Sequence, residues 1–318
     1  MTQVAVVQAG SVLFDTEATL TKFADLLSDA AGRLPNPTPR LVVFPEAFVG
    51  GYPKGSHFGA PVGSRSEEGR DLFARYFAAA IEVPGAETAF MQKLARDHAT
   101  DIIVGVVERD GGTLYCSALC FSSEGVLLGK RRKLMPTAAE RIVWGLGDGS
   151  TLDAFNAPSG RLAAVICWEN YMPMTRMSQY AQGVQIYCAP TVDDRPVWSA
   201  TMTTIALEGR CFVVSASQFL TRLAVPDDFR SVQGSSKDTV LINGGSIVVS
   251  PLGQVLCGPS FGGETILTAE LDLREIVRGK MDFDVAGHYA RPDVFRLEID
   301  RSAKKTISQD TWRNDRST

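Results

Sequence analysis

The sequence predicts one α/β domain in which buried strands alternate with amphipathic helices. Short apolar runs alternate with longer segments of helical periodicity along most of the chain. Near the C-terminus several strand-like runs follow one another without helices, as in a meander. Neither an internal repeat nor a linker divides the 318 residues, a length that suits one large domain or two ordinary ones. We therefore expect a single core.

The first elements are the clearest. Residues 4–9 form a continuous apolar run, typical of a strand buried on both faces. In residues 16–33 apolar side chains recur at spacings of three and four, which predicts one face of a helix. The Pro-rich residues 35–39 end it, and residues 41–44 form the next predicted strand. We interpret the Gly-, Ser- and Pro-rich residues 47–70 as a long loop, a type of segment that is often functional.

The same alternation continues to the C-terminal meander. Further helices are predicted over residues 86–98, 174–182 and 198–208. Further strands are predicted over residues 102–107, 114–121, 125–128, 162–166, 184–189, 211–216, 246–249, 254–257 and 265–271, with a polar loop near 220–240. The pattern fades after residue 285, so we divide the chain into a domain over residues 1–285 and a tail over residues 286–318, which we expect to pack on a partner subunit.

Composition excludes several classes of protein. Lys and Arg number 32 and Asp and Glu 36, a net charge of −4, whereas nucleic-acid binders usually carry a basic excess. The densest basic cluster, residues 130–133, is too short to change this. No run approaches the ~20 apolar residues of a membrane helix, and residues 1–10 resemble a strand more than a signal peptide. We expect neither a nucleic-acid nor a membrane partner.

The cysteines and histidines argue against disulfides and metal. None of the six cysteines forms a Cys-x-x-Cys pair, so we expect free thiols and a cytoplasmic location. The three histidines are scattered, which disfavours a zinc site. Gly145, Gly147 and Gly149 lack the βαβ context of a dinucleotide fingerprint. We therefore expect no metal and no cofactor.

Polar side chains at strand ends are the first functional candidates, because ligands of α/β sheets gather there. Glu46 follows the predicted strand 41–44, Cys167 follows 162–166, and Pro190 and Thr191 follow 184–189. Each has an ordinary explanation when taken alone, since strand ends are often polar and free cysteines are mostly buried small side chains.

Lys133 is the third candidate, although composition alone favours the alternative that it belongs to a basic turn in solvent after a hairpin. A thiolate can act as the nucleophile, a carboxylate can take its proton and activate water, and an ammonium can raise the thiolate fraction and stabilise a negatively charged intermediate. These three groups need neither histidine nor metal. They therefore suit a chain poor in both.

One competing motif is present. The letters GPSFG at residues 258–262 match a serine nucleophile elbow. The elbow requires a helix after the serine, whereas a strand is predicted there. We interpret these residues as a turn.

Three motifs together resemble the nitrilase superfamily of carbon–nitrogen hydrolases over nearly the whole chain. They are FPEAF at residues 44–48, RKLMPT at 132–137 and CWENYMP at 167–173. They correspond in order to the glutamate, lysine and cysteine segments of the family. The cysteine segment, APT at 189–191 and ALEGR at 206–210 are similar to the true nitrilase branch. AER at 139–141 matches the segment of a further glutamate, which points to Glu140.

The resemblance implies a four-layer αββα sandwich and a homodimer or larger homo-oligomer. It implies that Cys167 attacks a nitrile, that Glu46 acts as the base, and that Lys133 and a backbone N–H near Trp168 stabilise the intermediate. Glu140 would hold Lys133 or tune Glu46. Substrate-binding residues would include Pro190 and Thr191, together with three aromatic candidates for an apolar wall, for which core packing is an equal alternative: Tyr52, Trp168 and Trp198.

Other activities share this set of residues. An amidase or N-carbamoyl hydrolase would use the same glutamate, lysine and cysteine, as would an enzyme that hydrolyses cyanide. A catalytically silent scaffold on the same fold is an alternative of another class. The expected reaction is hydrolysis of a small nitrile to a carboxylic acid and ammonia, with some amide if the thiol leaves first.

Overall fold

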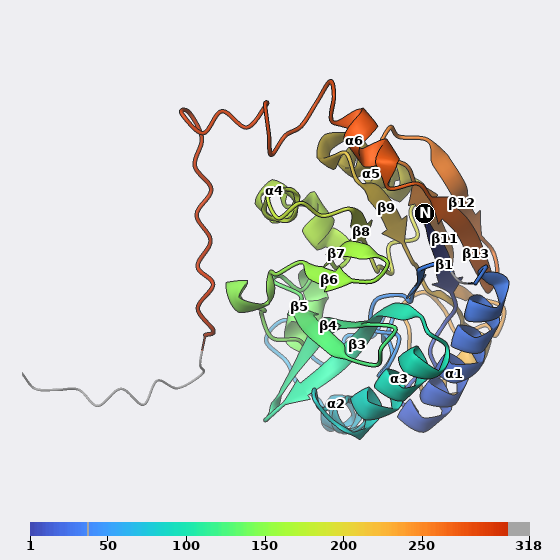
Figure 1. Cartoon of the computed structure of the whole chain (residues 1–318). Coiled ribbons are helices and arrows are strands. Elements are labelled where there is room, and N and C mark those ends of the chain that lie inside the picture. Colours follow the sequence, from blue (N-terminus) through green and yellow to red (C-terminus); the bar gives the residue numbers. More distant parts are fainter. Residues whose placement is uncertain (37, 305–318) are drawn as a thin grey trace, which may run out of the picture.

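The computed structural model describes residues 1–36 and 38–304. In this part of the chain the strands form two sheets that pack face to face, with helices against both outer faces (Figure 1). The expected four-layer αββα sandwich is therefore confirmed.

The first sheet comes mainly from the N-terminal half. Its strand order within the described residues is β13-β1-β2-β3-β4-β5. The three central strands run parallel to one another, and the others join them antiparallel. Their bounds are β1 (Thr2–Gln8), β2 (Arg40–Val43), β3 (Asp101–Asp110), β4 (Thr113–Phe121), β5 (Leu127–Arg132) and β13 (Thr265–Leu271).

The second sheet has the order β10-β11-β9-β8-β7-β6, with β12 also paired to β11. β7, β8 and β9 run parallel. The bounds are β6 (Phe155–Ala157), β7 (Gly160–Ala164), β8 (Ile186–Cys188), β9 (Phe212–Ser215), β10 (Phe219–Thr221), β11 (Val240–Val249) and β12 (Val255–Phe261). Most side chains of the parallel strands are buried, both on the face toward the other sheet and on the face toward the helices.

The helices are arranged around these sheets. The helical bounds are α1 (Thr16–Arg33), α2 (Glu67–Ala78), α3 (Ala86–Asp97), α4 (Pro173–Tyr180), α5 (Val197–Gly209) and α6 (Arg274–Gly279), with the 3-10 helices η1 (Ala138–Ile142), η2 (Gly149–Thr151), η3 (Cys167–Tyr171) and η4 (Arg222–Ala224). Asp15 caps α1 by accepting a hydrogen bond from the Ala18 N–H, which explains why this helix begins where the sequence predicts.

Three apolar layers hold the sandwich together. In β1, Val4 and Val6 face the other sheet, whereas Ala5 and Val7 face the helices. α1 and α3 cover the outer face of the first sheet with residues such as Phe23. α4 and α5 cover the second sheet. The continuous apolar strands thus follow from burial on both faces.

Several boundaries differ from the predictions. Residues 67–70 begin α2 instead of ending a loop, because Ser66 caps the helix by accepting from the Gly69 N–H. The predicted strand 125–128 extends as β5 to Arg132, since buried carboxylates neutralise its basic residues. β6 and β10 are short strands that the sequence pattern did not predict.

The turn interpretation of residues 258–262 is wrong, because residues 258–261 lie in β12. This strand pairs with β11 through register shifts, and an edge position tolerates proline. The segment that follows is β13, so the helix that a nucleophile elbow needs is replaced by a strand.

After α6 the chain leaves the sandwich. Residues 286–304 form neither helix nor strand and extend beyond the body of the molecule in Figure 1. They return to contact η2 and its neighbours, where Arg301 pairs with Asp153. Residues 305–318 of the predicted tail lie outside the described residues. Among the helices of residues 1–304, none has the length and apolar character required to span a membrane.

Candidate active site

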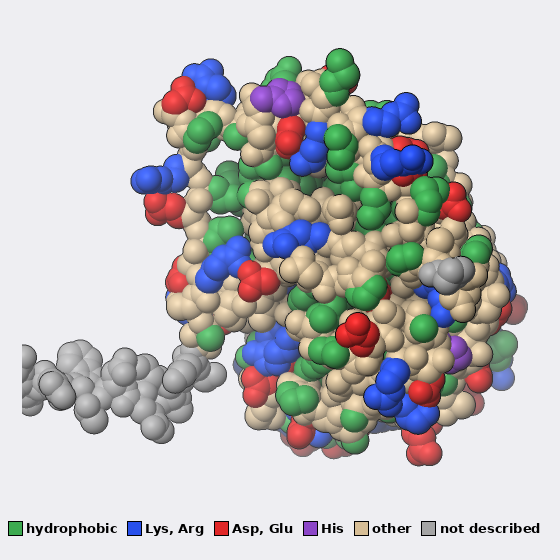
Figure 2. Space-filling view, in the orientation of Figure 1, with side chains coloured by type: hydrophobic (Ala, Val, Ile, Leu, Met, Phe, Trp, Pro, Cys, Tyr) green, Lys and Arg blue, Asp and Glu red, His purple; other side chains and the backbone are tan. Residues whose placement is uncertain are grey.

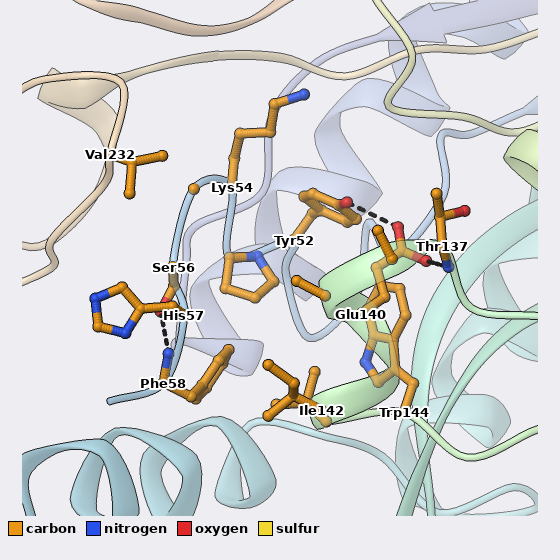
Figure 3. A pocket seen from close by; sticks show the side chains of 15 residues that line it. Tyr52, Lys54, Ser56, His57, Phe58, Thr137, Glu140, Ile142, Trp144 and Val232 are labelled. Carbon is orange, nitrogen blue, oxygen red and sulfur yellow. Dashed lines mark hydrogen bonds between the residues drawn. The ribbon is translucent and has the colours of Figure 1, made fainter. Parts of the chain in front are cut away.

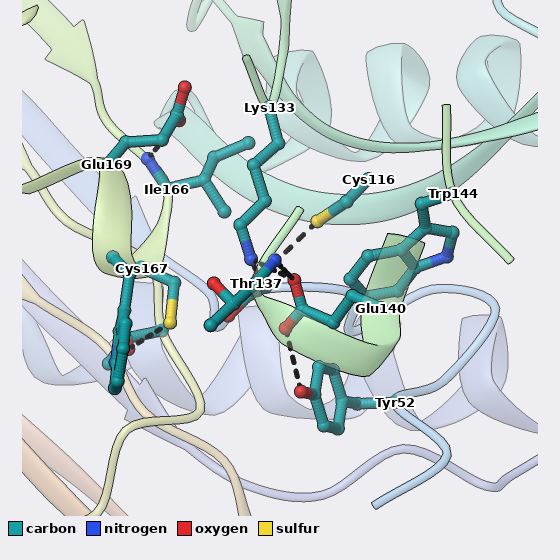
Figure 4. A network of polar contacts seen from close by, with 12 residues as sticks. Tyr52, Cys116, Lys133, Thr137, Glu140, Trp144, Ile166, Cys167 and Glu169 are labelled. Carbon is teal, nitrogen blue, oxygen red and sulfur yellow. Dashed lines mark hydrogen bonds and ion pairs between the residues drawn. The ribbon is translucent and has the colours of Figure 1, made fainter. Parts of the chain in front are cut away.

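Glu46, Lys133 and Cys167 come from both sheets. Glu46 follows β2 and Lys133 follows β5 in the first sheet, whereas Cys167 follows β7 in the second. All three side chains are buried. The structure brings them together between the two sheets, and Figure 4 shows the Cys167 sulfur and the Lys133 amine directed toward the same space.

A close approach of two backbones places Glu46. The segment after β2 continues along β3, where the Gly105 N–H donates to the Pro45 carbonyl over 3.1 Å. A Cβ atom on Gly105 would lie 2.3 Å from that carbonyl oxygen and 2.6 Å from the Glu46 Cα. Only glycine therefore fits beneath Glu46.

Lys133 lies between two carboxylates. Its Nζ is 2.7 Å from Glu46 Oε1 and 2.7 Å from Glu140 Oε2. Burial alone would lower the pKa of this ammonium, but the negative charges of Glu46 and Glu140 raise it well above its ordinary value. Lys133 is therefore a fixed cation. Because its side chain is fully buried, the alternative of a basic turn in solvent is wrong.

Glu46 presents one free oxygen. Its Oε1 accepts from Lys133 Nζ and, over 3.5 Å, from the Cys116 thiol. Its Oε2 is buried and has no hydrogen-bond partner among the described residues. Burial raises the pKa of Glu46, Lys133 opposes this change, and Glu140 adds to it. A carboxylate of this kind is a competent proton acceptor at Oε2.

Cys167 is the first residue of η3, on a strained turn that follows β7. Its φ is 50°, in the left-handed region. Its N–H donates to the Pro190 carbonyl over 2.9 Å, and its sulfur accepts from Thr191 Oγ1 over 3.3 Å. Pro190 and Thr191 thus hold Cys167 in this position.

The Cys167 thiol is protonated in this environment. Burial and the charge of Glu46 raise its pKa, and the opposing effect of Lys133 does not compensate. Lys133 does favour the thiolate, as predicted, but it does not produce a resting thiolate. The thiol must therefore lose its proton during attack, and Glu46 interacts with it closely enough for its own pKa to respond.

Glu140 lies in η1 and completes a chain of contacts. Its Oε1 accepts from the Tyr52 hydroxyl over 2.8 Å, and its Oε2 accepts from the Thr137 N–H over 2.6 Å as well as from Lys133. This arrangement fits the predicted role of holding Lys133. It also places a second negative charge near Glu46.

Two adjacent cavities meet at this site. One of about 230 Å³ is lined by Cys167, Trp168 and Asp193, and the other, of about 440 Å³, extends past Trp144 and Phe58. Tyr52, Lys54, Thr137 and Glu140 line both. Figure 3 shows the larger cavity with the Tyr52 hydroxyl directed at Glu140. Cys167 therefore opens into the smaller cavity, which is rich in charged side chains such as Asp193 and Arg195, and this cavity adjoins the larger and more apolar one.

The predicted substrate wall is partly wrong. Tyr52 and Trp168 line the cavities, but Trp198 lies outside their lining. Pro190 and Thr191, also predicted to bind substrate, lie outside the lining as well. Trp198 is buried between α5 and the second sheet, where its indole N–H donates to Ser215 Oγ over 2.9 Å. Its polar atom is satisfied in the core, so it belongs to the packing alternative.

Sequence reasoning missed several residues that support the site. The indole N–H of Trp168 donates to Asp193 Oδ2 over 2.9 Å, and the Arg195 guanidinium lies over the Trp168 ring, 4.8 Å from its centre. These two contacts hold the Trp168 side chain in place. Cys116 touches Glu46, and the buried pair Arg131–Glu169 lies behind Lys133 and Cys167. Glu169 does stand within the CWENYMP motif, and Arg131 directly precedes the RKLMPT motif, but their pairing depends on how the two sheets meet.

Comparison with known proteins gives a consistent result. The family model described as carbon-nitrogen hydrolase matches residues 3–280. An aliphatic nitrilase of Sinorhizobium fredii is 54% identical over 95% of this chain and 97% of its own. A nitrilase of Bradyrhizobium diazoefficiens is also 54% identical, over 96% and 94%. A bifunctional nitrilase/nitrile hydratase of Nicotiana tabacum is 50% identical over 95% and 87%.

Solved structures support the fold. A nitrilase-superfamily protein of Saccharomyces cerevisiae matches with a TM-score of 0.66 at 22% identity, over 91% of this chain and 96% of that one. A carbon-nitrogen hydrolase of Helicobacter pylori matches with a TM-score of 0.68 at 23% identity, over 88% and 92%.

Proposed function

The chain belongs to the carbon–nitrogen hydrolase family, in its nitrilase branch, and from this premise we propose that Cys167, Glu46 and Lys133 hydrolyse a nitrile to a carboxylic acid and ammonia. The observation that carries the proposal is the free Oε2 of Glu46, which shares a buried space with a protonated thiol and a fixed cation. Curated relatives about half identical over nearly the full length are nitrilases, which supports a nitrile as the substrate.

The first half of the reaction forms a covalent intermediate. Cys167 Sγ attacks the nitrile carbon while its proton passes to Glu46 Oε2. Glu46 then passes this proton to the nitrile nitrogen, which gives a thioimidate and leaves Glu46 ionised for the next step. Lys133 stabilises the negative charge that develops on nitrogen, together with the Trp168 backbone N–H. Because Lys133 is already held by two carboxylates, it needs no reorganisation during attack.

The second half consumes two waters. Glu46 takes a proton from the first water, whose oxygen adds to the thioimidate carbon, and the tetrahedral intermediate carries sulfur, hydroxyl and amine. Protonation of the amine and loss of ammonia leave a thioester. A second water releases the carboxylic acid and restores the thiol. If the carbon–sulfur bond breaks before the carbon–nitrogen bond, the product is the amide.

The test is an ammonia assay over aliphatic, aromatic and arylacetonitriles, with the matching amides and cyanide in the same panel. We expect ammonia from at least one nitrile and none from the Cys167→Ala variant. Faster release from amides would favour the amidase alternative, and release from cyanide alone would favour cyanide hydrolysis. Equal nitrile turnover by wild type and Cys167→Ala would refute the proposal.

We also propose that the chain acts as a homodimer or larger homo-oligomer. Large apolar side chains are exposed on η3, α4 and α5, among them Tyr171, Met174 and Val197. Figure 2 shows further apolar side chains beside the described part of the tail, which we propose packs on a partner subunit. Light scattering coupled to size exclusion should give at least twice the chain mass of 34.4 kDa.

The proposed compartment is the cytoplasm. Six free cysteines, five of them buried, suit a reducing environment. Fractionation of cells that produce the tagged chain should place it with cytosolic markers.

A further inference from the structure

The carboxylate of Glu169 collects three donors between the two sheets. Its Oε1 accepts from Arg131 Nη2 over 2.8 Å and from the Leu134 N–H over 2.6 Å. Its Oε2 accepts from the Ile166 N–H over 3.1 Å. The side chains of Glu169 and Arg131 are at most 1% exposed. Both oxygens are therefore satisfied in a buried, well-defined geometry.

The two backbone donors flank the two reacting residues. Leu134 directly follows Lys133, and Ile166 directly precedes Cys167. One carboxylate thus ties the segment after β5 in the first sheet to the turn after β7 in the second. Figure 4 shows the hydrogen bond between Glu169 and the Ile166 N–H, with both residues drawn above Cys167.

The ion pair between Arg131 and Glu169 limits the movement of the Glu169 carboxylate. Arg131 donates through Nη2 to Glu169 and through Nη1 to the carbonyl of Arg132. The guanidinium therefore braces the strand end that carries Lys133. A buried carboxylate with a cation and two backbone donors has few alternative positions, since any shift would leave a buried charge unpaired.

We propose that Glu169 is a positioning residue, which fixes Lys133 relative to Cys167 by binding the residue beside each. This proposal rests on the proposed function, because it assigns to the Lys133–Cys167 geometry a role in turnover. A displacement of about 1 Å at a reacting group can cost ~100-fold in rate. The expected loss is therefore in kcat, with KM largely kept, because Glu169 does not line either cavity.

The main variant is Glu169→Gln. The amide nitrogen of glutamine cannot accept a hydrogen bond and would face either the Leu134 N–H or the Ile166 N–H. One of these two backbone hydrogen bonds is therefore lost. The matched control is Glu108→Gln. Glu108 is equally buried and pairs with Lys130 and Arg132 of the same strand, but its contacts do not reach the Cys167 segment. Both variants break a buried ion pair on β5.

For Glu169→Gln we expect kcat to fall ~10- to 100-fold with KM within about threefold, and the acid-to-amide ratio to change. The product ratio does not depend on how much of the sample is folded, so a purely structural role would leave it unmoved. Glu108→Gln should lose a similar amount of thermal stability but keep the kcat and the product ratio of the wild type.

A second readout needs no substrate. The rate of Cys167 alkylation by iodoacetamide is followed against pH by mass spectrometry of its peptide. Lys133 lowers the pKa of the Cys167 thiol, so a displaced Lys133 should move the profile to higher pH. Removal of a nearby negative charge alone would move it to lower pH. The direction therefore separates positioning from simple electrostatics.

Wild-type kcat, product ratio and alkylation profile in Glu169→Gln would overturn the proposal, as would equal changes in Glu108→Gln. If Glu169→Gln is insoluble, Arg131→Lys takes its place, because lysine keeps the charge but lacks the second contact to Arg132. A wild-type chain that releases no ammonia from any nitrile would contradict the proposed function, and the alkylation profile would then decide the positioning role.

Discussion

Lys133 Nζ lies 2.7 Å from Glu46 Oε1, and this contact determines which oxygen of Glu46 remains available. Oε1 is engaged by the ammonium and by the Cys116 thiol, whereas Oε2 has no protein donor among the described residues. The same ion pair also limits the rise in the pKa of Glu46, because Lys133 opposes the effect of burial. The cation therefore acts on the base as well as on the intermediate.

Glu46→Gln should separate thiol reactivity from turnover. The amide cannot accept a proton, so we expect kcat to fall by about 10²- to 10⁴-fold. The negative charge of Glu46 raises the pKa of the Cys167 thiol, so its removal should speed alkylation of Cys167 near neutral pH. Ammonia release and peptide mass spectrometry measure the two effects. A variant that turns over at half the wild-type rate would contradict the assignment of the base.

The pH dependence of activity should reflect the raised pKa of Glu46. Burial raises the pKa of Glu46 above its ordinary value, and the reaction needs the deprotonated form. Activity should therefore fall as pH drops through a midpoint above the ~4.3 of an ordinary glutamate. Glu140 contributes to this shift, so Glu140→Gln should move the acid limb of kcat/KM to lower pH. An unmoved limb would mean that another group controls it.

Cys116 offers a test of how Glu46 is held. Its thiol donates to Glu46 Oε1 over 3.5 Å, and a serine hydroxyl could make the same contact. We expect Cys116→Ser to keep most of the activity and Cys116→Ala to lose severalfold in kcat, together with about 1–2 kcal/mol of stability. Steady-state kinetics and urea unfolding compare the two variants. Equal kinetics in both would show that the contact is dispensable.

Trp198 and Trp168 should respond differently to the same substitution. Trp198→Phe removes a buried hydrogen bond to Ser215 and should cost about 1–2 kcal/mol of unfolding free energy, with KM unchanged. Trp168→Phe alters the wall beside Cys167 and should change KM with a smaller effect on stability. Thermal unfolding and Michaelis–Menten analysis decide. If KM changed more in Trp198→Phe than in Trp168→Phe, Trp198 would be a substrate-binding residue after all.

The sequence predicts features that local chemistry determines. The helix over residues 16–33 has a cap at one end and prolines beyond the other, and its bounds are confirmed. Glu46 and Cys167 could be found because strand ends of an α/β sheet carry ligand groups. The turn at residues 258–262 was wrong because a glycine-proline pair on an edge strand has the same local signal.

Features that depend on how the sheets meet could not be predicted. Arg131 and Glu169 stand 38 residues apart and pair only because the end of β5 in the first sheet meets η3, which follows β7 of the second sheet. The same holds for Cys116, which reaches Glu46 from β4. Helix α5 is apolar over much of its surface, so periodicity did not show that Trp198 points to the core.

Gly105 has no functional group, yet the position of the proposed base Glu46 depends on it. Since a methyl group at this position would collide with the Pro45 carbonyl and the Glu46 Cα, we expect an alanine there to displace Glu46 from Lys133 while every polar side chain of the proposed site stays in the sequence. Searches for catalytic residues by chemical type would pass over it. Mutagenesis libraries aimed at new substrates should therefore keep this glycine fixed.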